Sequence, residues 1–197
     1  NFRISEEFFR SRGLSGQEEA YLKSYLNRYL PEDIGVLSVE EVSERFHSRL
    51  SAERKTYRYQ IETGEKQDVF QRRFRYHLGR KLDTEAMRLA AERLCGTHDF
   101  RSFCGNRKMK KSTVRTLYSM DICQEPGSSL VTISFTGNGF LQNMVRILTG
   151  TLIEIGLGER DWREADGILN AKDRQAAGFT APAEGLCLVR VIYEGLK

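Results

Sequence analysis

The segment between residues 114 and 136 constrains the fold most, because it has the pattern of two strands joined by a tight turn. Residues 114–123 and 130–136 are rich in β-branched and aromatic side chains, a composition typical of strands. Between them stands Glu125-Pro126-Gly127-Ser128-Ser129, whose residue types favour chain reversal. The sequence therefore predicts an antiparallel hairpin.

Helical patterns flank this hairpin. Asp83 is placed to cap a helix that ends at Gly96, and its predicted inner face consists of Met87, Ala90, Ala91 and Leu94. Further helices are predicted over about 140–155 and 161–170. A strand at 186–193 follows, apolar enough to be central in a sheet. This order predicts an α+β fold with an antiparallel sheet and with helices 83–94 and 140–155 packed on one face.

The first third of the chain has weaker patterns. Residues 16–29 have helical spacing before Pro31, and 34–42 have the β-branched character of a strand. Residues 55–61 alternate with period two, which predicts a half-buried strand. The pattern is interrupted after Gly64. We therefore expect residues 1–64 to form the remainder of an N-terminal subdomain and residues 65–197 to form a C-terminal α+β subdomain.

Positive charge is concentrated in the middle of the chain. Residues 45–120 carry a net charge of +11, whereas residues 1–44 carry −4 and residues 121–197 carry −3. Arginine outnumbers lysine 22 to 9, and its guanidinium group suits phosphate contacts and stacking on bases. An ordinary solvated basic face is the alternative. The local mixture of cations with aromatic residues favours a surface that binds a polyanion.

The composition argues against several classes of protein. The four cysteines form no C-x-x-C pair, so zinc-ligand spacing is absent, and free thiols in a reducing cytoplasm are favoured over two disulfides. No apolar run reaches the roughly 18 residues of a membrane span. The start lacks an initiator Met and the pattern of a signal peptide, so we expect a trimmed or processed beginning. Nucleotide-binding loops, G-x-S-x-G and H-E-x-x-H are absent, and we expect neither a metal nor a cofactor.

Three segments combine residue types that carry chemistry. Residues 45–59 interleave aromatics with cations, as a strand that stacks bases and neutralises phosphates requires, although an ordinary edge strand has the same pattern. Within it, His47 is interpreted as structural or phosphate-contacting rather than as a catalytic base. Arg146 lies in an otherwise apolar helix, so it either pairs with an acid or phosphate or extends to the surface. Residues 180–188 are, on pattern alone, a turn that enters a strand.

Taken together, these segments resemble the TruA family of tRNA pseudouridine synthases, and the similarity extends over nearly the whole chain. The family's blocks L-P-x-D-I, F-H-x-R…Y-x-Y, H-D-F-x-S-F, F-L-x-x-M-V-R-x-x-x-G and A-P-A-E-G-L occur in order. They correspond to Leu30–Ile34, Phe46–Tyr59, His98–Phe103, Phe140–Gly150 and Ala181–Leu186. Five ordered blocks at compatible spacing are a specific match, whereas one alone is not.

The resemblance implies cofactor-free isomerisation of uridine to pseudouridine at positions 38 to 40 of the tRNA anticodon arm. By motif position, Arg146 would pair with the nucleophilic aspartate, Tyr57 would stack on the target base, and Leu186 would line the pocket. The cations of the middle third would contact RNA phosphates. The residues expected to do so are His47, Arg49, Lys55, Arg58, Lys110, Lys111 and Arg115. The resemblance also implies a cytoplasmic homodimer.

The chain departs from the family at its start. The family's nucleophilic aspartate lies in a G-R-T-D-x-G-V-H motif that is absent from this sequence, and Asn1-Phe2 resembles the residues shortly after that motif. We therefore expect this chain alone to be inactive. Two other classes stay open: a non-catalytic tRNA-binding module that uses the same basic cleft, and a structural oligomerisation domain whose basicity is incidental.

Overall fold

The computed structural model of the chain describes residues 1–106 and 108–193. The sequence also predicts a basic loop over residues 107–111, and its first residue, Arg107, lies outside the described residues. The chain forms two compact units, one made of residues 1–51 and the other beginning at Ala52. The expected subdomain boundary at residue 64 falls within the second unit and stays a prediction.

The first unit contains two helices, α1 (Glu6–Arg10) and α2 (Glu18–Tyr29). Helix α2 matches the prediction for residues 16–29. The prediction of a strand over 34–42 was wrong, because these residues pair with no strand in the described chain. The side-chain amide of Asn27 instead satisfies the backbone of Val36, accepting from its N–H at 2.7 Å and donating to its carbonyl oxygen at 2.9 Å.

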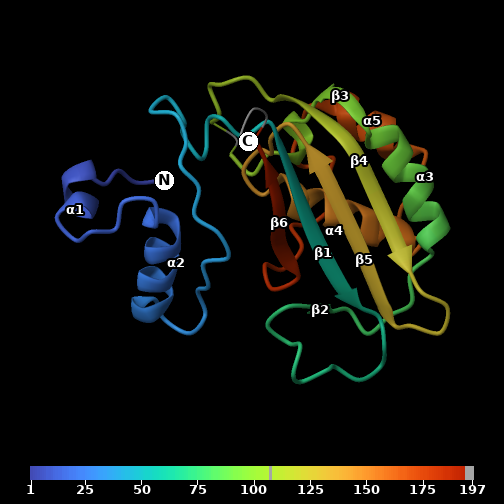
Figure 1. Cartoon of the computed structure of the whole chain (residues 1–197). Coiled ribbons are helices and arrows are strands. Elements are labelled where there is room, and N and C mark those ends of the chain that lie inside the picture. The colour runs from blue at the N-terminus through green and yellow to red at the C-terminus, as the bar shows by residue number, and fades with distance from the viewer. Residues whose placement is uncertain (107, 194–197) are drawn as a thin grey trace. The chain divides into compact units, whose positions relative to one another are not determined.

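The second unit is built on a six-stranded mixed sheet (Figure 1). Its strands are β1 (Arg54–Glu62), β2 (Tyr76–His77), β3 (Gly96–Asp99), β4 (Val114–Gln124), β5 (Leu130–Gly137) and β6 (Leu186–Ile192). The predicted hairpin is β4 with β5. Strands β2, β1, β5, β4 and β3 follow one another across the sheet, and β6 also pairs with β1. The pairing of β1 with β2 is parallel, and the other pairings are antiparallel.

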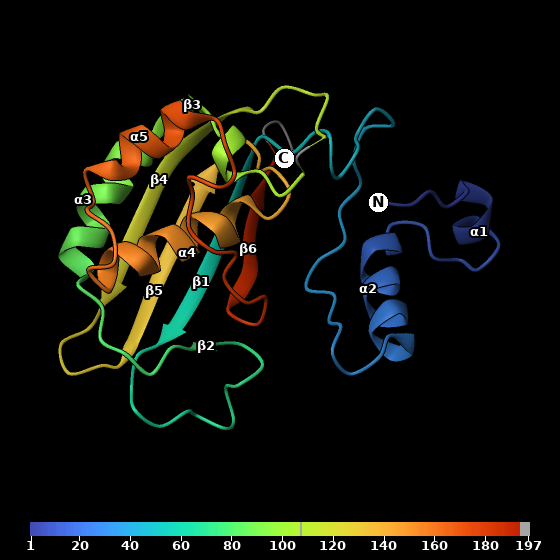
Figure 2. The ribbon, with the colours of Figure 1, turned by 180° about the vertical axis from the view of Figure 1, so that it is seen from behind.

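Three helices cover one face of this sheet, as Figures 1 and 2 show. They are α3 (Thr84–Leu94), α4 (Met144–Gly156) and α5 (Glu164–Ala171). The carboxylate of Asp83 caps α3 as predicted, by accepting from the backbone N–H groups of Glu85 and Ala86 at 3.0 Å. The predicted inner face of α3 is buried in the core together with eleven residues of α4. The predicted α+β fold with helices on one face is confirmed.

Two predicted elements differ in the structure. Helix α4 begins at Met144 rather than at 140, because Asn143 adopts a left-handed conformation with φ of 58° that no α-helix continues through. Strand β6 is not central. In the described chain it pairs with β1 alone, and residues 187–190 are exposed. None of the described helices is long and apolar enough to cross a membrane.

Candidate active site

Strand β1 points two tyrosines toward the helix-covered face. Side chains alternate along a strand, so Tyr57, Tyr59 and Ile61 share a face, and the last two have no exposed surface. Tyr57 is half-buried, and its ring meets Phe140 edge to face with centroids 5.2 Å apart. Phe140 lies in the turn before α4, so this contact brings β1 to the beginning of that helix.

Arg146 lies in the first turn of α4 and is half-buried among apolar neighbours. Its Nε donates to the carbonyl oxygen of Ala181 at 2.6 Å, and Nη1 lies 3.4 Å from Oδ1 of Asn143. None of the ion pairs found among the described residues includes Arg146. The guanidinium group is therefore fixed at one nitrogen by a backbone oxygen, and no described carboxylate forms an ion pair with it.

The loop between Thr180 and Gly185 connects Arg146 with Tyr59. Its Ala181 N–H donates to the backbone oxygen of Arg146 at 3.0 Å, and its Pro182 carbonyl accepts from the Tyr59 hydroxyl at 2.6 Å. Gly185 lies flat against Tyr59, since a methyl group there would come within 2.7 Å of the ring carbons. One loop thus holds the cation and the tyrosine.

Leu186 follows this loop directly and pairs with Tyr59 across the sheet. It is half-buried and packs against the hydrophobic core. The structure therefore brings two of the predicted site residues, Arg146 and Leu186, to the same loop. Tyr57 adjoins them through its neighbour Tyr59 on β1 and through Phe140.

Tyr59 is the residue that sequence reasoning missed. Burial raises the pKa of its phenol well above the ordinary value, and the nearby carboxylate of Glu184 adds to this effect, while Arg146 opposes it. The hydroxyl is consequently neutral and acts as a hydrogen-bond donor. The Y-x-Y pattern could have shown that both tyrosines lie on one face of a strand, but not which group accepts from the Tyr59 hydroxyl.

The residues expected to contact RNA lie on several elements, and their role stays a prediction. Arg58 is exposed and, by strand alternation, lies on the face opposite to Tyr57. Lys110 and Lys111 are exposed on the loop before β4, and Arg115 on β4 donates to the carbonyl oxygens of Ser112 and Val114. Lys55 is half-buried on β1.

The other two of these residues, His47 and Arg49, belong to the first unit, where both are exposed. Nδ1 of His47 accepts from the backbone N–H of Arg49 at 3.1 Å. This contact fits the interpretation of His47 as a structural or phosphate-contacting residue.

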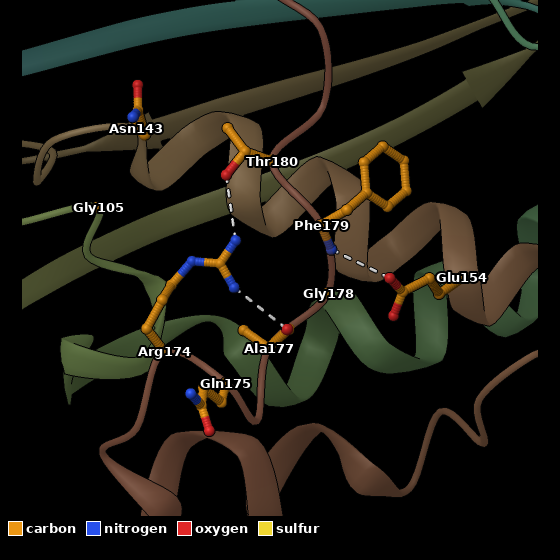
Figure 3. A pocket seen from close by; sticks show the side chains of 9 residues that line it. All are labelled: Gly105, Asn143, Glu154, Arg174, Gln175, Ala177, Gly178, Phe179 and Thr180. Atoms are coloured by element: carbon orange, nitrogen blue, oxygen red, sulfur yellow. Dashed lines mark hydrogen bonds between the residues drawn. The ribbon is translucent and has the colours of Figure 1, made fainter.

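A cavity adjoins the site without containing it. It has a volume of about 510 Å³ and lies between α4 and the chain before β6 (Figure 3). It is lined by Gly105, Asn143, Glu154, Arg174, Gln175, Ala177, Gly178, Phe179 and Thr180. Tyr57, Arg146 and Leu186 do not line it. The three predicted residues lie around the loop before β6 instead.

Comparison with known proteins decides the family. A family model described as tRNA pseudouridine synthase matches residues 90–194. The tRNA pseudouridine synthase A of Bacillus subtilis (strain 168) is 45% identical over 169 residues, which cover 86% of this chain and 68% of the relative. The chain belongs to the tRNA pseudouridine synthase A family. The enzymes of this family are isomerases that convert uridine in tRNA to pseudouridine.

Other members of the tRNA pseudouridine synthase A family are similarly close. The protein from Geobacillus sp. (strain WCH70) is 45% identical over 172 residues, or 87% of this chain and 68% of the relative. A tRNA pseudouridine synthase A 2 from Bacillus anthracis is 44% identical over 175 residues, or 89% of this chain and 71% of the relative. The residues matched by the family model include Arg146 and Leu186, whereas Tyr57 precedes them.

Proposed function

We propose that this chain supplies the cation and the base-binding surface of a tRNA pseudouridine synthase that acts at positions 38 to 40 of the anticodon arm. The proposal rests on the bonding partners of Arg146. Its Nε is held by Ala181, and no described carboxylate forms an ion pair with it. A half-buried guanidinium is costly unless an acid or phosphate compensates it. The aspartate of the family's G-R-T-D-x-G-V-H motif is the partner that the resemblance implies.

The reaction needs a nucleophile and no cofactor. The aspartate attacks the target nucleotide, the glycosidic bond between the ribose and N1 of uracil breaks, and the freed base rotates. C5 then bonds to C1′ of the ribose, the bond between C1′ and the aspartate breaks and regenerates the carboxylate, N1 takes up a proton, and the proton on C5 leaves to solvent. Arg146 would hold the aspartate carboxylate in place and stabilise its negative charge before attack. The 197 residues lack that motif, so by themselves they would bind tRNA without converting it.

The base must leave its stack before it reacts, which costs a few kcal/mol. Tyr57 would offset this cost by stacking on the extruded uracil, since its ring is half-buried and supported from the side by Phe140. Leu186 would form an apolar wall of the same pocket. The neutral Tyr59 beneath them would fix the loop rather than contact the base.

Tritium release from tRNA labelled at C5 of uridine tests this function, because the C5 proton is lost only when the new bond forms. The test compares the 197-residue chain with an extended chain, in which the family's aspartate-bearing segment precedes residue 1. We expect release from the extended chain and none from the 197 residues. A transcript with cytidine at positions 38 to 40 should release no tritium. Release by the 197 residues would show that we have misplaced the nucleophile.

If neither chain releases tritium but both bind tRNA, the chain is the non-catalytic binding module instead.

We propose in addition that the protein works as a homodimer in the reducing cytoplasm. Light scattering coupled to size exclusion would measure its mass in solution. A monomer at micromolar concentration would contradict the dimer.

A further inference from the structure

The segment Ala177–Ala181, which we call the strap, lies along α4 (Figure 3). Two successive residues of the strap form hydrogen bonds to side chains of α4. The N–H of Gly178 donates to Oγ1 of Thr151 at 2.9 Å. The next N–H, of Phe179, donates to the carboxylate of Glu154 at 3.0 Å. The strap is therefore tied to α4 by the backbone of two adjacent residues.

The strap also lies in close contact with α4. Gly150 of α4 lies directly beneath the carbonyl group of Phe179, where any Cβ atom would overlap the oxygen. A Cβ atom on Gly178 would come within 2.7 Å of the backbone of Thr151. These distances leave no gap between the strap and α4. The surface of α4 therefore determines where the strap lies.

The strap ends on the proposed catalytic cation. Two hydrogen bonds join Ala181 to Arg146. The Ala181 N–H donates to the backbone oxygen of Arg146, and the Ala181 carbonyl oxygen accepts from Nε of Arg146. A shift of the strap would therefore turn the guanidinium group. The orientation of Arg146 depends on groups that touch neither the RNA nor the reacting atoms.

Thr151 is the buried polar group that joins the strap to α4. It has no exposed surface, and its hydroxyl donates to the carbonyl oxygen of Ile147 at 2.9 Å while accepting from Gly178. Thr149 is a matched neighbour, because it is equally buried and donates to Val145 at 2.9 Å. Its hydroxyl bonds within α4 rather than to the strap.

On its other side, the strap is bonded by the side chain of Arg174. Arg174 donates from Nη1 to the Ala177 carbonyl at 3.2 Å and from Nη2 to Oγ1 of Thr180 at 3.1 Å (Figure 3). Thr180 is half-buried. A change at Thr180 therefore alters the strap with little risk to the core.

We propose that Thr151 is a positioning residue for Arg146, and that it acts through the strap. This inference rests on the proposed function, in which Arg146 pairs with the nucleophilic aspartate. The hydroxyl of Thr151 fixes Gly178, the strap carries that position to Ala181, and Ala181 fixes Nε of Arg146. No bond is made or broken by Thr151 itself.

The first experiment uses the 197-residue chain and does not depend on activity. Hydrogen exchange at the Arg146 Nε–H is followed by NMR in protein with ¹⁵N-labelled arginine, and Arg146→Lys assigns the signal. Thr151→Val removes the hydroxyl while keeping the shape, so exchange should accelerate about tenfold as the bond to Ala181 loosens. Thr149→Val and Thr151→Ser should leave it unchanged. Thr180→Val should accelerate exchange as well, which keeps the test valid if Thr151→Val folds poorly.

The second experiment measures the extended chain in single turnover. Thr151→Val should lower the rate between about tenfold and 100-fold, as a misplaced catalytic group does, with tRNA affinity unchanged. Thr151→Ser should restore the rate. Unchanged exchange in a folded Thr151→Val protein would overturn the proposal, and so would faster exchange with a normal rate. If Thr151→Val does not fold, unchanged exchange in Thr180→Val overturns it instead. Normal turnover by Arg146→Ala would instead remove the proposed catalytic role of Arg146, and the positioning role with it.

Discussion

The hydroxyl of Tyr59 donates a 2.6 Å hydrogen bond to the carbonyl oxygen of Pro182, which is 123 residues away in the sequence. The bond ties β1 to the loop that holds Arg146. Because the phenol is buried and lies near Glu184, its pKa is raised above the ordinary value. The fold thus depends on a protonated tyrosine.

This dependence predicts a loss of stability at alkaline pH. In the unfolded chain a tyrosine releases its proton near pH 10, whereas the folded chain retains it. The stabilisation is therefore complete below about pH 10 and is lost as the pH rises further, by at most about 1.4 kcal/mol per pH unit. Denaturant unfolding between pH 8 and 11 measures it.

Tyr59→Phe is the control for this pH dependence. It should be less stable at pH 8 by about 1–3 kcal/mol, because the Pro182 oxygen loses its donor. Its free energy of unfolding should then decline less steeply than that of the wild type above pH 10. Parallel curves for the two proteins would show that other groups cause the alkaline loss.

Two glycine-to-alanine changes should have opposite effects on stability. Gly150→Ala would drive a methyl group into the Phe179 carbonyl, so we expect it to destabilise the chain by roughly 1–3 kcal/mol or more. Gly167→Ala lies in helix α5 with open space around it, and it should stabilise by about 0.5–1 kcal/mol. Thermal unfolding of both variants provides the comparison. A Gly150→Ala protein of normal stability would mean that the strap yields easily.

Arg146→Ala should abolish most turnover in the extended chain. Removing one partner of a buried charge pair costs about 3–5 kcal/mol, equivalent to two to four powers of ten if it is felt in the transition state. The affinity for tRNA should change little, since many phosphate contacts persist. Single-turnover rates and filter binding measure the two quantities. Normal turnover would leave Arg146 with only the structural role of bonding Ala181.

Tyr57→Ala should slow the reaction less than Arg146→Ala. The loss of the stacking surface costs roughly 1–3 kcal/mol for an extruded base. Tyr57→Phe keeps the ring and its contact with Phe140, so it should retain tRNA binding, and its rate will reveal whether the hydroxyl has a separate role. A Tyr57→Ala enzyme with an unchanged rate would place the stacking residue elsewhere.

The basic loop should contribute to the salt dependence of tRNA binding. Each phosphate contact that is removed lowers the magnitude of the log–log salt slope by about 0.7 to 0.9. Replacing Lys110 and Lys111 together by alanine should therefore flatten the slope by roughly twice that amount. Lys23→Ala, on the exposed side of α2 in the acidic part of the chain, is the control. Equal slopes would move the phosphate contacts to another surface.

The elements predicted well are those whose pattern is complete within a short stretch. Helix α3 has its cap, its apolar stripe and its terminating glycine within about one helix length, and the hairpin has its turn between two alternating strands. Residues 34–42 had the composition of a strand but pair with no strand in the described chain, and the backbone of Val36 bonds the side chain of Asn27 instead. Strand β6 was misplaced since apolar composition does not distinguish a central strand from one with an exposed face.

The sequence indicated individual residues of the candidate site, but not the hydrogen bonds between distant segments that hold them together. Motif position singled out Arg146 and Leu186, and both adjoin the loop before β6 in the structure. No local pattern could show that the Arg146 side chain bonds Ala181, which lies 35 residues away. The role of Tyr59 was missed for the same reason, because its acceptor belongs to a distant loop.

Strand β1 precedes the other described strands of the sheet in the sequence, yet its two long neighbours come much later in the chain (Figure 1). Tyr59 pairs with Ile133 on one side and with Leu186 on the other. A ribosome therefore releases β1 long before the strands that complete it, and its apolar face stays exposed in the nascent chain. We expect chaperones that bind exposed apolar segments to hold this strand during translation, so that the yield of folded protein in a cell depends on completion of β6.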